Sequence, residues 1–176
     1  KAQYEVWLNA DTTATSSVHL EYQNNNPVTP QPPKHYGGGY NNFLRLLRDP
    51  TWDLGEVLRD GKRIDMKTLS GEIDTVSHAT SSGMLADVGG GETHSFTYTY
   101  LHKKRIDYTQ PQEYVLNIQK QPGLTTNEYE IAFHVPAHTS IKSIDSPIHY
   151  EYQNNVLRIH TTITRDFSIS FTVEPQ

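Results

Sequence analysis

Apolar residues fall on every second position through most of the last third of this chain. The pattern occurs in four segments, at residues 114–119, 129–135, 156–161 and 167–173. Period-two alternation buries one face of a strand and leaves the other in water, which is how antiparallel sheets are built. The sequence therefore predicts an all-β fold, an antiparallel immunoglobulin-like β-sandwich.

The first part of the chain also contains strand patterns, but turns and breaks interrupt them more often. Residues 4–9 and 16–24 predict a hairpin, and residues 94–100 predict a further strand. Residues 24–40 are rich in proline and glycine, so we expect a surface insertion without regular structure. Residues 42–48 are too few for periodicity to distinguish a strand from one or two helical turns.

Two asparagines at residues 154–155 predict a tight hairpin turn, since Asn tolerates the positive φ that such turns need. Pairing across this turn sets Tyr152 opposite Leu157 and Glu151 opposite Arg158. One face of the hairpin is then apolar, and the other places opposite charges together. A slip of one residue would mix the two faces, so this register is the one we predict.

Asp60-Gly61 is a second hairpin signal. A strict two-residue turn there would set Arg59 opposite Lys62, and like charges directly opposite each other are destabilising. We therefore expect a longer loop or a bulge at this turn.

The two halves of the chain resemble each other weakly. Each has a hairpin, then short strands, then a polar turn that leads into a strong strand. The sequence thus predicts two tandem β units, which is compatible with a length of 176 residues. Residues 1–108 would form a β-sandwich unit that carries the insertion at residues 24–40, and residues 109–176 would form a second, smaller unit.

Composition excludes several classes of function. The formal net charge is −5 and the only basic run is at residues 103–105, which argues against a nucleic-acid partner. The chain has no cysteine, and this excludes disulfides, zinc–thiolate sites and thiol catalysis. No apolar run approaches the roughly 20 residues that span a bilayer. We expect no membrane contact from this segment.

The residue patterns of metal sites and active sites are missing from the sequence. None of the nine histidines forms the His-x-x-x-His pair of a helical zinc site, and none alternates as His-x-His on a strand. His149 and His160 oppose each other across the predicted hairpin and would need a third ligand to hold a metal. The acidic residues lack the spacing of an EF-hand loop, although a calcium site built from backbone carbonyls stays open. We expect no metal, no cofactor and no catalytic residue, so the chain is predicted not to be an enzyme. The catalytic alternative is an esterase or a glycosidase.

One motif carries a resemblance to a known family. Residues 114–123 form an extended strand that ends in Lys-Gln-Pro-Gly, where Pro ends the ladder and Gly supplies the turn. The segment resembles the C-terminal β region of an uncharacterised family of membrane-anchored bacterial cell-surface proteins, a domain of unknown function. The motif consists of Gln119, Lys120, Gln121, Pro122 and Gly123. Further matches lie at residues 42–45, 91–93, 98–100, 133–136 and 164–166.

The resemblance implies a location and a role. It implies an extracytoplasmic domain at the cell surface, with the membrane anchor of the full-length protein outside these residues. The implied role is that of a stalk, a spacer or a protein-interaction module. Another surface protein or a cell-wall glycan would be its partner. The resemblance supplies no catalytic residue.

Loop aromatics support an alternative from another class, a carbohydrate-binding module. Tyr36 and Tyr40 flank three glycines, and Trp52 follows shortly after them. Exposed aromatic side chains stack on sugar rings or anchor protein interfaces. The plainer interpretation is that Tyr40 and Trp52 cover the end of the sandwich.

Overall fold

The structure, a computed structural model, describes residues 1–29, 38–73, 79–120 and 128–176. Strands occupy each of the alternating segments. The described residues contain no α-helix, and a single 3₁₀ turn at Met66–Thr68 is their only helical element. They accordingly include no helix with the length and apolar character needed to cross a bilayer. The predicted all-β class is confirmed.

Packing divides the chain into two compact units. The first comprises residues 1–18 and 101–176, and the second comprises residues 19–100. Strand β2 (Ala14–Gln23) begins in the first unit and ends in the second, whereas β8 (Thr93–His102) runs the other way. Compact packing does not test whether a segment is an independent domain. The division into tandem domains at residue 108 therefore stays a prediction.

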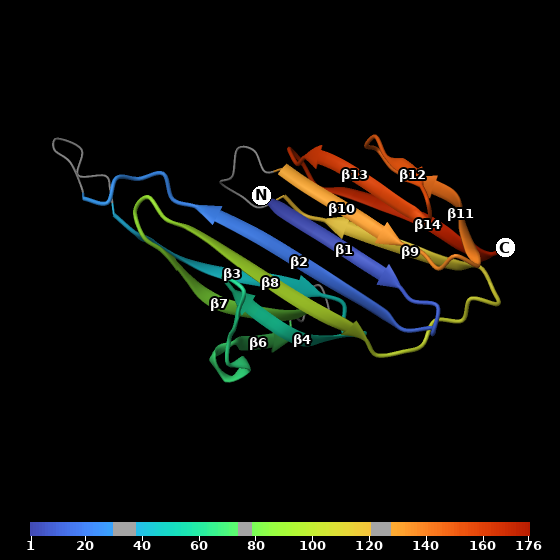
Figure 1. Ribbon diagram of the computed structural model, residues 1–176, viewed down its shortest axis with the longest axis horizontal. Coiled ribbons are helices and arrows are strands. Elements are labelled where there is room, and N and C mark those ends of the chain that lie inside the picture. The colour runs from blue at the N-terminus through green and yellow to red at the C-terminus, as the bar shows by residue number, and fades with distance from the viewer. Residues whose placement is uncertain (30–37, 74–78, 121–127) are drawn as a thin grey trace. The chain divides into compact units, whose positions relative to one another are not determined.

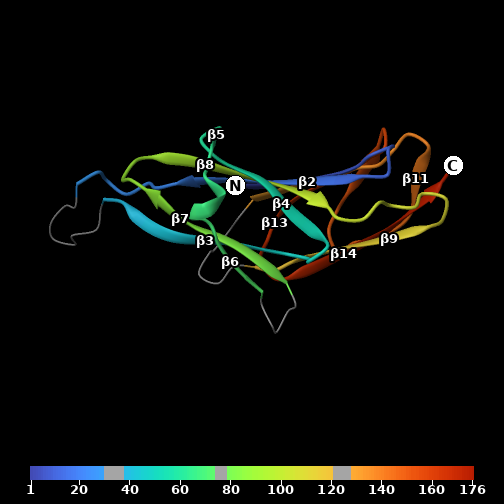
Figure 2. The same ribbon diagram turned by 90° about the horizontal axis from the view of Figure 1, so that it is seen from below.

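The first unit contains strands of two sheets, which form separate layers in Figures 1 and 2. One layer has the order β12-β13-β10-β1 and the other β11-β14-β9. The strands are β1 (Ala2–Leu8), β9 (Gln112–Ile118), β10 (Glu128–His134), β11 (Thr139–Asp145), β12 (Glu151–Gln153), β13 (Val156–Thr162) and β14 (Phe167–Pro175). All the described pairings in this unit are antiparallel except that of β1 with β10, which is parallel. Alternation fixes the buried face of a strand but not the direction of its neighbour.

Aromatic rings join the two layers of the first unit. Tyr4 of β1 meets Phe133 of β10 edge to face, with ring centroids 6.2 Å apart. Phe133 contacts Phe171 of β14 at 4.8 Å, and Phe171 stacks on Tyr114 of β9 at 5.4 Å. Such pairs add roughly 0.5–1.5 kcal/mol each beyond the area they bury. Burial also raises the pKa of Tyr4 to about 12, although a hydrogen bond with Ser16 opposes the shift.

The second unit is also built from antiparallel strands. Its antiparallel sheet has the order β3-β7-β6, and β4 pairs with the short β5. The strands are β3 (Tyr40–Arg48), β4 (Trp52–Arg59), β5 (Lys62–Arg63), β6 (Ser70–Ile73) and β7 (Thr80–Val88). Leu44 of β3 lies opposite Met84 of β7, and both are buried. The segment at residues 42–48, which periodicity left open, is thus a strand.

The hairpin turn at residues 154–155 is confirmed. Both asparagines have positive φ, 51° and 61°. Glu151 lies opposite Arg158 and Tyr152 opposite Leu157, as the sequence predicts. The side chain of Asn155 also fastens the turn to a neighbouring loop, because its Nδ2 donates to the carbonyls of Pro136 (3.0 Å) and Thr139 (3.1 Å).

The turn at Asp60-Gly61 differs from the prediction. The expected longer loop or bulge is wrong, since the turn has two residues, with φ of 50° and 72°, and Arg59 pairs directly with Lys62. The two cations avoid each other because the Arg59 side chain turns away. Its Nη2 donates to the carbonyl of Asp87 at 2.9 Å. Repulsion between like charges on paired strands therefore does not prevent a two-residue turn when one of the side chains can bond elsewhere.

Replacing Asn155 with glycine should destabilise the chain, while the same change at Asn154 should be nearly neutral. Glycine accepts positive φ at both positions, so only the two hydrogen bonds of the Asn155 side chain distinguish the variants. A typical hydrogen bond contributes roughly 0.5–1.5 kcal/mol, so the loss of both should cost about 1–3 kcal/mol of unfolding free energy. Urea unfolding of Asn155→Gly and Asn154→Gly measures the difference. Equal stabilities would contradict the assignment of these bonds.

Candidate functional site: a polar groove on the outer face of β1, β10 and β13

The outer face of the first layer carries rows of polar side chains. Because β1, β10, β13 and β12 are adjacent, residues in register form lines across the four strands. One line is Gln3, Glu130, His160; the next is Glu5, Ala132, Arg158, Glu151; the third is Trp7, His134, Val156, Gln153. The alternate residues of the same strands, such as Ile131 and Ile159, are buried in the core.

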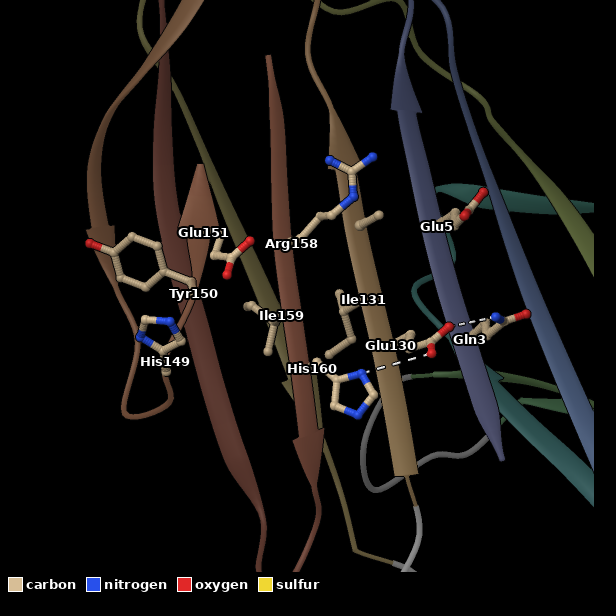
Figure 3. Close-up of a pocket in the computed structure, with 11 residues that line it drawn as sticks. Gln3, Glu5, Glu130, Ile131, His149, Tyr150, Glu151, Arg158, Ile159 and His160 are labelled. Carbon is tan, nitrogen blue, oxygen red and sulfur yellow. Dashed lines mark hydrogen bonds and ion pairs between the residues drawn. The ribbon is translucent and has the colours of Figure 1, made fainter. Parts of the chain in front are cut away.

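A groove of about 330 Å³ lies on this face, and the first two of these lines border it. Its middle is low because Ala132 is small and sits between two charged neighbours, Glu5 on β1 and Arg158 on β13. Figure 3 shows Arg158 reaching over β10 toward the side of Glu5. Among the described residues, neither Glu5 nor the Arg158 guanidinium takes part in a hydrogen bond or in an ion pair within 4 Å. Both charged groups therefore remain available to a ligand.

Glu130 differs from Glu5 and Arg158, because its carboxylate is already bound by neighbouring side chains. Lys1 Nζ lies 2.7 Å from Oε1, and Gln3 Nε2 donates to Oε2 at 2.6 Å (Figure 3). His160 Nδ1 lies 3.8 Å from the same carboxylate. These bonds, that of Lys1 above all, lower the pKa of Glu130. The group stays ionised and serves to order its neighbours.

An aromatic pair lies on the same face, in the line of residues next to the groove. Trp7 stacks on His134 with centroids 5.3 Å apart and an interplanar angle of 12°. Burial lowers the pKa of His134, with Glu5 raising it and Arg158 lowering it. The imidazole is therefore neutral near pH 7. Glu5 and Arg158 belong to the neighbouring line of residues on this face.

Two of the loop aromatics predicted from sequence, Tyr40 and Trp52, do not come together. Tyr40 begins β3, and Trp52 follows the other end of that strand, where the Nε of Arg48 donates to its carbonyl at 2.9 Å. The two ends of a nine-residue strand lie roughly 26 Å apart. Tyr36 lies outside the described residues. A carbohydrate site built from these three aromatics stays a prediction.

The Lys-Gln-Pro-Gly motif lies where β9 ends. Gln119 and Lys120 follow the last residue of the strand, and Gln121, Pro122 and Gly123 lie outside the described residues. The backbone N–H of Lys120 donates to Oδ1 of Asp166 at 2.7 Å. Asp166 belongs to the Thr-Arg-Asp turn, another of the segments that carry the family resemblance. Two of the matched segments therefore contact each other.

His149 and His160 both line the groove. Over the described ranges, no group of three or more His, Cys, Asp or Glu side chains has an arrangement that could hold a metal ion. The ring of His160 faces Glu130, as the dashed line in Figure 3 marks.

A second polar cluster, in the second unit, was missed by the sequence analysis. His94 lies between two carboxylates, with Nδ1 2.8 Å from Asp60 and Nε2 3.1 Å from Glu92. Both nitrogens can donate only in the imidazolium form. The bond to Asp60, followed by that to Glu92, accordingly raises the pKa of His94, while Arg59 opposes the shift. The sequence shows the two tight turns that carry the carboxylates, at Asp60-Gly61 and Gly89–Glu92. It does not show that strand pairing brings these turns together around His94.

Comparisons with known proteins concern the fold alone. No model of a known protein family matches the sequence, and no curated protein is similar to it. Native leukotriene A4 hydrolase from Saccharomyces cerevisiae has a similar structure, with a TM-score of 0.50 and 10% identity over 97% of this chain and 28% of that chain. An M1 zinc metallopeptidase from Deinococcus radiodurans gives a TM-score of 0.44 at 10% identity, over 99% of this chain and 41% of that one. The chain thus spans less than half the length of either enzyme.

Replacing His94 with glutamine should destabilise the chain in acid more than in alkali. The raised pKa means that the imidazolium contributes stability fully below the unfolded value of 6.5, and the contribution is lost as pH rises through the folded pKa. Urea unfolding at about pH 5.5 and about pH 8.5 measures the difference between wild type and His94→Gln. Glu92→Gln, which keeps the bond to Asp60, should show a smaller change. A difference that is independent of pH would contradict the assignment of an imidazolium bonded to both Asp60 and Glu92.

Proposed function

We propose that this chain is a non-catalytic β domain of a bacterial cell-surface protein, where it acts as a stalk, a spacer or an interaction module. The family resemblance supports the location. The contact between Lys120 and Asp166 adds to this support, because it gives two of the matched segments a common structural task. Another surface protein or a cell-wall glycan is the expected partner.

The observation that carries the proposal is the state of Glu130. A carboxyl group that donates a proton in catalysis needs a raised pKa. Glu130 has a lowered pKa and is saturated by Lys1 and Gln3. The groove beside it is also open and shallow, with ionised groups aligned by strand register. These features favour a preformed binding face over proton transfer.

Two further observations support an interaction module. The yeast hydrolase contains a similar fold as 28% of its chain, so this architecture also works as one part of a longer polypeptide. In the second unit, Phe43 and Leu85 lie opposite each other on β3 and β7 with 52% and 64% of their surfaces exposed. Adjacent exposed apolar side chains are typical of surfaces that contact proteins.

Labelling of intact cells tests the proposed location. In the source bacterium, a membrane-impermeant amine reagent should modify the full-length protein without lysis, because this domain carries exposed lysines such as Lys62 and Lys103. A cytosolic protein in the same cells should remain unlabelled until lysis. Labelling of both proteins only after lysis would overturn the surface assignment.

Substrate assays test the absence of catalysis. The 176-residue chain should release product from aminoacyl-p-nitroanilides, p-nitrophenyl acetate and p-nitrophenyl glycosides no faster than buffer does, with or without added zinc. Glu130→Gln should behave as wild type in every assay. Turnover by wild type above the buffer rate would overturn the proposal, and its loss in Glu130→Gln would assign the reaction to Glu130.

A further inference from the structure

The hollow over Ala132 is bounded by two carboxylates, a guanidinium and an aromatic ring. Across the strands it lies between the Glu5 carboxylate and the Arg158 guanidinium. Along β10 it lies between Glu130 and His134, the residues two positions away on the same face. A ligand in this hollow therefore meets an acceptor on one side, a donor on the other, and an aromatic pair at one end.

The charges around the hollow define the chemistry that it can hold. A carboxylate only accepts hydrogen bonds and a guanidinium only donates them. A hydroxyl group does both, so neighbouring hydroxyls can donate to Glu5 and accept from Arg158 at the same time. An anionic ligand would face the carboxylates of Glu5 and Glu130, and a cationic ligand would lie beneath Arg158. A neutral ligand rich in hydroxyls has neither conflict.

The aromatic border fits the same class of ligand. The indole of Trp7 is held flat against His134 and is partly exposed. Because His134 has a lowered pKa and is neutral near pH 7, the pair presents an uncharged surface next to the charged hollow. Sugars combine apolar C–H faces with hydroxyl edges. An aromatic face beside fixed polar groups is the arrangement that orients such ligands.

We propose that the groove over Ala132 binds a neutral glycan segment, with hydroxyls bridging Glu5 and Arg158 and a sugar face against Trp7. This deepens the proposed function, on which it rests, by naming the ligand class of the interaction module. It assigns the site to the first unit, whereas the loop aromatics Tyr40 and Trp52 belong to the second.

Titration of the ¹⁵N-labelled 176-residue chain with maltotriose, cellotriose and chitotriose tests the proposal. At least one of these neutral trisaccharides should shift the amide signals of Glu5, Ala132 and Arg158. An open groove with few contacts predicts weak binding, so the titration extends to on the order of 10 mM. Absence of shifts with all three would overturn the proposal.

Variants of the hollow make the test specific. Ala132→Leu fills the hollow without changing a charge and should weaken binding about tenfold or more, whereas Ala132→Ser should keep it. Arg158→Gln removes the charged donor and should also weaken binding about tenfold or more. Arg165→Gln, an exposed arginine on a turn of the same unit, is the matched control and should bind as wild type does. Retention of binding by both Ala132→Leu and Arg158→Gln would overturn the site.

Charged trisaccharides complete the experiment. Trigalacturonate and a glucosamine trimer carry opposite charges on similar rings, and both should bind more weakly than the best neutral probe. Tighter binding of either would overturn the ligand class. Melting temperatures identify variants that fail to fold. If Ala132→Leu fails to fold, the binding of Arg158→Gln decides the test. Glycan binding without labelling of intact cells would contradict only the proposed location. Labelling of intact cells without glycan binding would contradict only this inference.

Discussion

The contact between Phe133 and Phe171 is the interaction on which the groove depends. It joins β10 to β14 across the interior of the first unit, with centroids 4.8 Å apart. Because side chains alternate along a strand, a Phe133 that points inward requires Ala132 and His134 to point outward. A slip of one residue would bury these groups and expose the rings. The polar face is thus a direct consequence of the apolar one.

Parallel pairing of β1 with β10 supplies the other half of the groove. Glu5 and Ala132 are more than a hundred residues apart in sequence, and only this pairing makes them neighbours. Arg158 then arrives from the opposite side through the antiparallel partner β13. Three strands with three different origins therefore build one hollow. The backbones of the two charged residues are separated by β10, and the small side chain of Ala132 leaves the space between them open.

Local patterns predict the strands of this protein well, and some of their pairings. The turn at residues 154–155 and the pair Glu151–Arg158 follow from short-range rules, because asparagine tolerates positive φ and opposite charges attract. The same rules failed at Asp60-Gly61, where Arg59 found a partner on β7 that the local sequence does not contain. The groove was not predictable for the same reason. The sequence shows which face Glu5 occupies but not which strand lies beside it.

Two histidines illustrate how far the surroundings, and not the residue type, set the chemistry. His94 sits between carboxylates at the surface, and the hydrogen bond to Asp60 raises its pKa. His134 stacks on Trp7, and burial lowers its pKa. As pH falls below the ordinary value of 6.5, the first gains a proton that its bonds require, while the second resists a proton that its site disfavours. Acid therefore strengthens one contact of the second unit and weakens one of the first. The aromatic pair beside the groove needs the neutral imidazole of His134, so acid weakens this part of the first unit.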